Sequence, residues 1–174
     1  MGQGSSEVLV HVKTVLIVYH SMTGGTRQMA EAAAAGARAV EDIAVVLKRA
    51  GEADANDVTS ADGFIFASPE NLAAMSGMLK DFFDRTYYAA LEQLNGRPYL
   101  MLICAGSDGR GAAQQIARIA TGWRLKAVAE PHIVCTHATV TDQILKPKTL
   151  RVEDLRTCGE LGETLASGLA LGVF

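Results

Sequence analysis

The chain has 174 residues, 49% of them hydrophobic, which is enough for one sizeable core and too few for two. Sixteen basic residues against 19 acidic ones give a formal net charge of −3, so no basic surplus favours a nucleic-acid partner. The longest apolar runs, such as residues 14–19 and 99–105, are far shorter than the roughly 20 residues that cross a bilayer. No secretory signal is visible at the start, and we expect a cytoplasmic location.

The cysteines and histidines show no spacing that is typical of a metal site. Cys104, Cys135 and Cys158 are an odd number without a CxxC pair, and two of them lie inside apolar runs. They are therefore interpreted as buried, reduced thiols. The four histidines form no HExxH motif and no paired spacing with carboxylates, so no metal ion is expected.

Strand-like runs alternate with helix-like segments along the chain. Lys13–Tyr19 is short, apolar and rich in β-branched residues, which is typical of a strand buried on both faces. The same criteria predict strands at 13–19, 43–47, 62–67, 99–104 and 126–136. Helix formers and helical spacing of apolar residues predict helices at 26–40, within 53–61, from 76 to about 95, at 111–123 and at 151–171. Thr23 or Thr26 is the expected N-cap of the first helix.

This alternation implies an α/β fold, a doubly wound, five-stranded parallel sheet with helices on both faces and right-handed crossovers. The expected strand order is 2-1-3-4-5, because Pro131 cannot donate a ladder hydrogen bond and favours an edge position for the fifth strand. Residues 12–174 would form this single domain after a flexible segment, 1–11. Ligands bind such sheets beyond the carboxyl ends of the strands, at the switch point between strands one and three. The candidate binding loops are 20–26, 67–76 and 104–111.

The first loop has the composition of a phosphate site at the start of a helix. Gly24 and Gly25 let the backbone approach an anion closely, and the hydroxyls of Ser21, Thr23 and Thr26 can donate to phosphate oxygens. The lysine of the GxxxxGK[ST] motif is missing, so hydrolysis of a nucleoside triphosphate is not expected. The loop suits a terminal monophosphate that is held and not transferred. The alternative is a plain glycine turn with a threonine cap.

Three segments together resemble the flavodoxin-like family, in the right order and at the right strand ends. Residues 21–26 have the family's phosphate-loop pattern of Ser or Thr, any residue, Thr, Gly, any residue, Thr. Residues 68–85 are similar to the segment that wraps the isoalloxazine ring in FMN reductases and quinone reductases. Residues 104–111 resemble the second ring-binding loop. The resemblance covers nearly the whole chain and implies a flavodoxin-like, FMN-binding domain.

The resemblance also assigns residues to the cofactor. It assigns the FMN phosphate to Ser21, Thr23, Gly24, Gly25 and Thr26, with Met22 in the same loop. One side of the isoalloxazine ring is assigned to Ser68, Pro69, Glu70, Asn71, Leu72 and Ala73. The end of the same loop is assigned to Met75, Ser76 and Gly77. At the pyrimidine edge of the ring it places four backbone N–H groups, those of Ala105, Gly106, Ser107 and Gly109. Negative charge accumulates at this edge when a flavin is reduced. Arg110 either stabilises that charge or is a solvated arginine at a helix start. No catalytic side chain is expected, because the flavin carries the chemistry.

Three departures from flavodoxins favour a reductase over an electron carrier. Residues 68–77 and 105–111 contain no aromatic side chain to stack on the ring, and 71–73 contain no glycine whose peptide could flip to stabilise a semiquinone. The charge of −3 is mild for a dedicated carrier. We expect an oxidoreductase that takes hydride from NADH or NADPH and passes electrons to a quinone or another small-molecule acceptor. The alternative is a flavodoxin-type electron-transfer protein.

A third reading follows from Cys104 and Arg110, which have the C-x5-R spacing of cysteine phosphatases. That chemistry needs a thiolate, whereas Cys104 ends an apolar strand and Gly111 stands where Ser or Thr usually follows the arginine. Cys104 is therefore interpreted as a core residue. Members of the flavodoxin-like family often form dimers or tetramers, and the alanine-rich helices would permit a homodimer or homotetramer.

Overall fold

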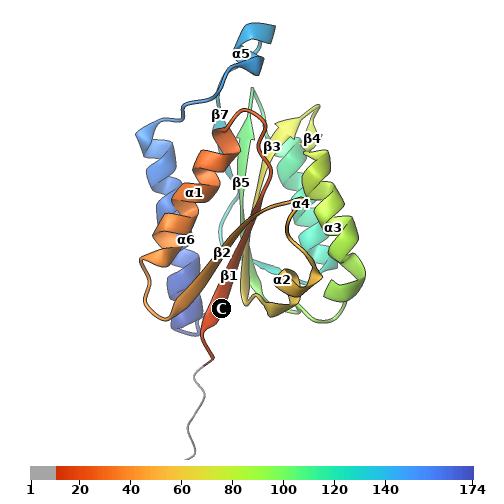
Figure 1. Cartoon of the computed structure of the whole chain (residues 1–174), viewed down its shortest axis with the longest axis vertical. Coiled ribbons are helices and arrows are strands. Elements are labelled where there is room, and N and C mark those ends of the chain that lie inside the picture. The colour runs from red at the N-terminus through yellow and green to blue at the C-terminus, as the bar shows by residue number, and fades with distance from the viewer. Residues whose placement is uncertain (1–10) are drawn as a thin grey trace, which may run out of the picture.

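The computed structural model describes residues 11–174 and has three layers (Figure 1). A twisted sheet lies in the middle, with α1 (Gly25–Arg38) and α6 (Val152–Ala170) on one face. The other face is covered by α2 (Ala55–Ser60), α3 (Gly77–Ala90) and α4 (Arg110–Gly122). The predicted α/β architecture is confirmed. The flexible segment expected at 1–11 lies, apart from His11, outside the described residues.

The strands fall where apolar runs predicted them, with two additions. The strands are β1 (Lys13–Tyr19), β2 (Ile43–Arg49), β3 (Gly63–Asn71), β4 (Ala74–Met75), β5 (Pro98–Ala105), β6 (Lys126–Ala127) and β7 (His132–Cys135). The pairs of the main sheet are parallel, in the order β2-β1-β3-β5, with β6 and β7 both paired to β5 at the edge. This matches the predicted order 2-1-3-4-5, with the fifth position occupied by two short strands.

The fifth strand is interrupted around Pro131, because proline has no backbone N–H to donate to the ladder. Tyr99 pairs with Ala127, and Leu102 pairs with His132. Between these pairs the edge chain advances five residues (127 to 132) while β5 advances three (99 to 102), so two extra residues bulge out of the ladder. The single strand predicted for 126–136 is therefore wrong in its continuity and right in its position.

Local turn geometry corrects other expectations. The N-cap of α1 is Gly24, at φ 91°, and no side chain caps this helix, so the cap predicted at Thr23 or Thr26 is wrong. A left-handed glycine turns the chain directly into the helix, which no threonine does at low cost. The third helix ends at Ala90 and not near residue 95, because Glu92 turns the chain at φ 60°. The short helix α5 (Thr141–Leu145) was not expected.

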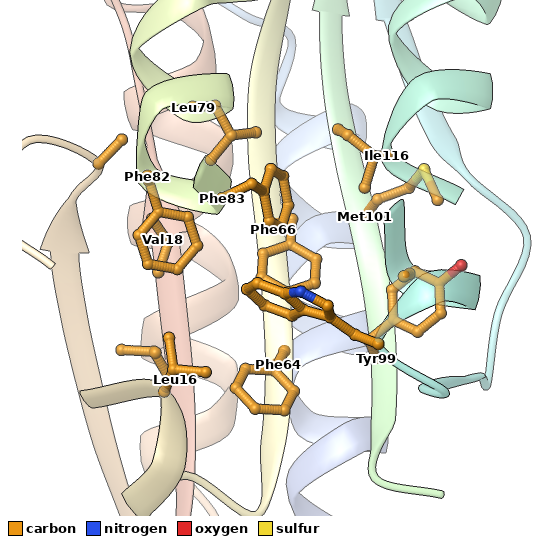
Figure 2. Close-up of a cluster of buried hydrophobic side chains, with 14 of the residues drawn as sticks. Leu16, Val18, Phe64, Phe66, Leu79, Phe82, Phe83, Tyr99, Met101 and Ile116 are labelled. Carbon is orange, nitrogen blue, oxygen red and sulfur yellow. The ribbon is translucent and has the colours of Figure 1, made fainter. Parts of the chain in front are cut away.

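An aromatic cluster fixes β3 in the middle of the sheet. Figure 2 shows Phe66 among the rings of α3 and β5, and its ring centroid lies 5.0 Å from that of Phe83 and 6.1 Å from that of Tyr99. Trp123, at the end of α4, lies 5.2 Å from Phe83. These side chains are nearly fully buried, and large buried aromatic rings contribute strongly to core stability. The carboxyl end of β3 therefore projects from a well-packed strand.

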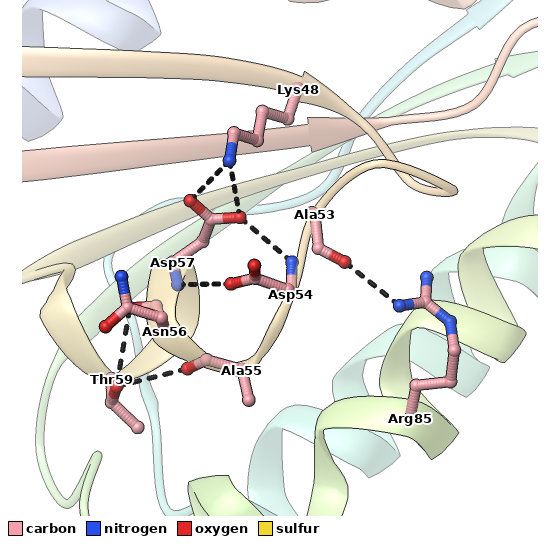
Figure 3. Close-up of polar contacts among 8 residues, drawn as sticks. All are labelled: Lys48, Ala53, Asp54, Ala55, Asn56, Asp57, Thr59 and Arg85. Atoms are coloured by element: carbon pink, nitrogen blue, oxygen red, sulfur yellow. Dashed lines mark hydrogen bonds and ion pairs between the residues drawn. The ribbon is translucent and has the colours of Figure 1, made fainter.

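The six-residue helix α2 is held by polar contacts at its start (Figure 3). The Asp54 side chain accepts from the backbone N–H of Asp57, and the Asp57 side chain accepts from the backbone N–H of Asp54. Lys48 donates to Asp57 over 2.7 Å, and Arg85 from α3 donates to the carbonyl of Ala53. The backbone hydrogen bond from Asp57 lowers the pKa of Asp54. This capping box orders a helix that is too short to be stable alone.

Helices α1 and α6 pack with almost no space between their backbones. A Cβ atom at Gly36 would lie 1.9 Å from the carbonyl oxygen of Gly159. A Cβ atom at Gly162 would lie 2.0 Å from the carbonyl oxygen of Ala33. Both distances are far below van der Waals contact, so the helices could not approach this closely with any other residue at these two positions.

We predict that Gly162→Ala destabilises the protein by about 1–3 kcal/mol, because the new methyl group forces the two backbones apart. An alanine normally stabilises a helix interior relative to glycine, so the sign of the change is diagnostic. The matched control is Gly122→Ala at the end of α4, where a Cβ meets nothing within 4 Å. Urea unfolding gives both free energies. Equal stability of the two variants would contradict the close packing.

Candidate functional site

A cleft of about 520 Å³ lies beyond the carboxyl ends of β1, β3 and β5. This volume is within the roughly 300–1,000 Å³ of small-molecule sites. Fourteen residues of the three predicted loops line it: Ser21, Met22, Thr23, Gly25, Thr26, Pro69, Glu70, Asn71, Leu72, Ala73, Cys104, Ala105, Gly106 and Ser107. The other lining residues are Thr136, Ala138, Ile144, Leu145 and Lys148. The loops that were expected to meet do so.

The first loop presents the unsatisfied N-terminus of α1. By position, the N–H groups of Gly25, Thr26 and Arg27 have no carbonyl partner inside the helix, and no side chain caps them. The Ser21 hydroxyl oxygen accepts from the backbone N–H of Gly24 over 3.1 Å, which leaves its own proton free to donate. Thr26 is buried. Free N–H groups, a hydroxyl donor and the positive end of the helix dipole together suit an anion.

Gly25 lets this loop rest directly on the end of β5. A Cβ atom at Gly25 would lie 2.5 Å from the sulfur of Cys104. The Cys104 side chain thus fills the space that a larger residue would need. The second glycine of the loop is required by this close approach, and the first, Gly24, by its positive φ.

The second loop is a tight β3–β4 hairpin. Glu70 pairs with Met75 and Asn71 with Ala74, so only Leu72 and Ala73 form the turn. Their φ angles are 52° and 61°, the left-handed values of a type I′ turn, which normally takes Asn and Gly. The Leu72 side chain is fully exposed at the tip. Non-glycine residues in this conformation cost of order 1–3 kcal/mol each, so the surrounding contacts must hold the turn.

The carboxylate of Glu70 supplies the main contact that holds the hairpin. One oxygen accepts from the backbone N–H of Gly109 over 2.8 Å, and the other accepts from that of Ala112 over 3.0 Å. Glu70 therefore caps the N-terminus of α4 from another element. Two helix N-termini meet at this cleft, and the one of α4 is already neutralised. The N-terminus of α1 is the one left for a bound anion.

This cap corrects part of the predicted site. The N–H of Gly109 was expected to face a ligand, but it donates to Glu70, and Gly109 does not line the cleft. Arg110 points to solvent, with its side chain 78% exposed and paired to Asp108 over 2.6 Å. Arg110 is therefore a solvated arginine at a helix start. The Gly109 N–H and the Arg110 guanidinium each donate to a nearby carboxylate, Glu70 and Asp108 respectively, because charge-assisted hydrogen bonds are stronger than neutral ones.

Four further predicted residues lie in or beside the hairpin without lining the cleft. The hydroxyl of Ser68 donates to the carbonyl of Pro69 and accepts from the N–H of Ser76. Ser76 caps α3 by accepting from the N–H of Leu79. Met75 lies in β4, and Gly77 is the first residue of α3. Gly24 also lies outside the lining and acts through the turn that it makes.

The connection from β7 to α6 (residues 136–151) contributes a wall of the cleft that was not predicted. Thr136, Ala138, Ile144, Leu145 and Lys148 come from this connection. Figure 1 shows its helix α5 beyond the carboxyl ends of the strands. Two signals could have found it. The fifth strand is parallel, so its carboxyl end meets the same edge, and a connection of this length is often functional.

Gln28 ties this connection to the first loop. Its side-chain amide donates to the carbonyls of Gly24, over 2.9 Å, and Lys148, over 2.7 Å, and its carbonyl accepts from the N–H of Leu150. The backbone N–H of Lys148 also donates to the carbonyl of Thr23 over 2.7 Å. The phosphate-loop candidate and the β7–α6 connection therefore form one structural unit.

The structure argues against a nucleophilic role for Cys104. Its sulfur packs against Gly25, and burial raises the pKa of its thiol to about 11. Arg110, the other half of the C-x5-R pattern, is held by Asp108. A neutral thiol without its arginine cannot act as the thiolate of a phosphatase. The core interpretation of Cys104 is the one that fits.

Residues 11–174 contain neither a membrane-spanning helix nor a cluster of metal ligands. No helix in this range combines the length and apolar character that crossing a bilayer requires. Within the same range, no three side chains of His, Cys, Asp or Glu come together as metal ligands would.

Comparison with known proteins places the chain among flavin proteins. The family model "NADPH-dependent FMN reductase" matches residues 47–140, more than half of the chain. A protein named flavodoxin from Aquifex aeolicus is 37% identical over 105 residues, 59% of this chain and 55% of its own. An NAD(P)H dehydrogenase (quinone) from Acidithiobacillus ferrooxidans is 36% identical over 92 residues, 41% of this chain and 46% of its own. The chain spans about half the length of these relatives.

Solved structures agree on the fold. A flavodoxin from the domain Archaea superposes with a TM-score of 0.73 and 19% identity, over 90% of this chain and 99% of its own. A flavodoxin, WrbA-like protein from Agrobacterium tumefaciens gives a TM-score of 0.72 and 20% identity, over 91% and 98%. The resemblance to the flavodoxin-like family that the three loops indicated is confirmed.

We predict that Glu70→Ala exposes the amides of α4 and lowers stability by about 1.5–3 kcal/mol, the range for hydrogen bonds to a charged group. Hydrogen exchange measures the protection of individual amides, and the N–H groups of Gly109 and Ala112 should lose protection first. Glu163→Ala, at an exposed position of α6, is the matched control. Unchanged protection at both amides would contradict the cap.

Proposed function

The chain belongs to the NADPH-dependent FMN reductase family, and on that premise we propose that it is an NAD(P)H-dependent reductase whose cleft binds FMN. It would take hydride from NADH or NADPH and pass the electrons to a quinone or another small-molecule acceptor. When bound, the flavin supplies the hydride and electron-transfer chemistry. The protein binds and orients the cofactor, and leaves room for the two substrates.

The observation that carries this proposal is the difference between the two helix N-termini at the cleft. The start of α1 has free N–H groups and neighbouring hydroxyls of Ser21, Thr23 and Thr26, whereas Glu70 neutralises the start of α4. A single anion therefore fits at the α1 end. This matches a flavin that carries one terminal phosphate, and the residues present fit the group.

The cleft also has aliphatic walls that suit a flat, apolar ring. Its rim includes the side chains of Met22, Leu72, Ile144 and Leu145, and no aromatic residue occurs among the described residues that line the cleft. Aliphatic walls bury a ring without stacking on both of its faces, which leaves one face for a nicotinamide or a quinone. The N–H groups of Gly106 and Ser107, at the end of β5, would serve the pyrimidine edge of the ring.

A flavodoxin-type electron carrier is the second candidate, since the relative from Aquifex aeolicus bears the name flavodoxin. The mild net charge of −3 and the aliphatic rim favour the reductase. A carrier docks to a partner protein through surface charge, whereas a reductase oxidises NADH or NADPH alone. Activity of the purified protein separates the two.

We predict that the purified protein releases FMN, and that NADH or NADPH reduces the bound flavin under anaerobic conditions directly to the two-electron state. Chromatography identifies the flavin, and stopped-flow absorbance follows its reduction. FAD in the released fraction, or no flavin after saturation with FMN, would overturn the cofactor assignment. A flavin that both nucleotides leave oxidised, but dithionite reduces, would favour the carrier.

We predict that Thr26→Glu abolishes FMN binding, because it places a carboxylate beside the expected phosphate in a buried position. Thr26→Ala removes one hydroxyl donor to a charged group, which corresponds to roughly 1.5–3 kcal/mol or about 10–150-fold in affinity. Quenching of flavin fluorescence measures both. Thr121→Glu on the exposed side of α4 is the control for added charge. Parent-like binding by both Thr26 variants would remove this loop from the site.

A further inference from the structure

Lys148 stands out because the first loop contains no lysine, yet the fold brings this one beside it. Among the described residues that line the cleft, Lys148 is the sole lysine or arginine. Its Cβ lies 3.5 Å from the position that a Cβ on Gly25 would take, and its backbone N–H donates to the carbonyl of Thr23. The stem of Lys148 therefore starts next to the N-terminus of α1.

The backbone at this position cannot drift away from the loop. The Gln28 side chain holds the carbonyl of Lys148 and the N–H of Leu150 at the same time. Gln28 itself lies in the first turn of α1. The lysine is thus anchored to the same turn that presents the free N–H groups.

The ammonium group is also fixed in place. Its nitrogen donates to three carbonyls at the end of α5, those of Gln143 over 2.8 Å, Ile144 over 2.8 Å and Lys146 over 2.6 Å. An ammonium has three donors, so all of them are used. Neutral carbonyls orient the group and leave its charge in place. The same contacts hold Ile144 at the rim of the cleft.

Glu70 is the other charged side chain among the described residues that line the cleft, and it is already engaged, as is the nearby Arg27. The carboxylate of Glu70 is occupied by α4, and Arg27, in the first turn of α1, pairs with Glu31 over 3.7 Å. The Cys104 thiol beside the loop is neutral at ordinary pH. A lysine stem is four carbons long, which keeps the charge within a Debye length, roughly 10 Å, of the start of α1.

We propose that Lys148 is the cation that selects a phosphorylated flavin, held on the end of α5 so that its charge acts on the phosphate at the N-terminus of α1. This inference rests on the proposed function and deepens it. A fixed charge costs no reorganisation when the anion arrives. The neutral hydroxyls of the loop would orient the phosphate, and Lys148 would add the electrostatic attraction that they lack.

The test compares FMN with riboflavin, which differ by the phosphate alone. Lys148→Met should weaken FMN binding by about 10–100-fold and change riboflavin binding by less than about threefold. The variant should also lose much of the salt dependence of FMN binding, because the screened attraction is gone. Lys148→Arg keeps the charge and should restore most of the preference for FMN. Thermal unfolding checks that each variant is folded.

Lys146→Met is the matched control, because this lysine lies two residues away in the same connection but does not line the cleft. It should leave the ratio of FMN to riboflavin affinity unchanged. Equal losses for both flavins in Lys148→Met would mean that Lys148 only holds α5, and would overturn the inference while the proposed function stands. Parent-like binding of both flavins would do the same. A parent protein that binds neither flavin would overturn both proposals.

Discussion

The carboxylate of Glu70 caps one of the two helix N-termini beside the cleft, that of α4, and leaves that of α1 uncapped. In a doubly wound sheet, helices α1 and α4 both begin at the carboxyl edge, where their free N–H groups and dipoles attract negative charge. Glu70 neutralises the start of α4 with two hydrogen bonds and joins the β3–β4 hairpin to it. The contrast between an uncapped helix start at α1 and a capped one beside the hairpin depends on this contact.

The contact is effective because β3 is fixed by its surroundings. Phe64 and Phe66 are fully buried in the aromatic cluster, so the end of the strand carries Glu70 to a defined place. The strained turn at Leu72 and Ala73 is held against the start of α4, where a Cβ on Gly111 would lie 2.1 Å from the carbonyl oxygen of Ala73. Core packing, hairpin and helix cap thus stabilise one another.

The cleft is built from segments inside and outside the range that the family model matches. The family match covers residues 47–140, which include the hairpin and the start of α4. The first loop and α5 lie outside that range, and they meet through Gln28 and Lys148. The hairpin and the start of α4 are therefore the part of the cleft that lies within the match to the reductase family model, whereas the start of α1 and α5 lie on either side of it.

Local patterns determined much of this protein. The apolar, β-branched run at Lys13–Tyr19 predicted β1 to the residue, and Pro131 marked the edge position where the ladder is broken. The glycine and hydroxyl pattern of residues 21–26 placed a loop at the cleft correctly, because a turn between a buried strand and a helix is encoded by adjacent residues.

Only the tertiary structure decided how the remaining groups are used. Glu70 and Gly109 are 39 residues apart, and Gln28 and Lys148 are 120 apart, so no local pattern reports that they meet. An N–H group at a helix start is free for a ligand only if no distant acceptor reaches it, and a lysine serves a site only where the chain returns to it. Periodicity and turn chemistry describe neighbours in sequence, whereas hydrogen-bond partners and charges are settled by neighbours in space.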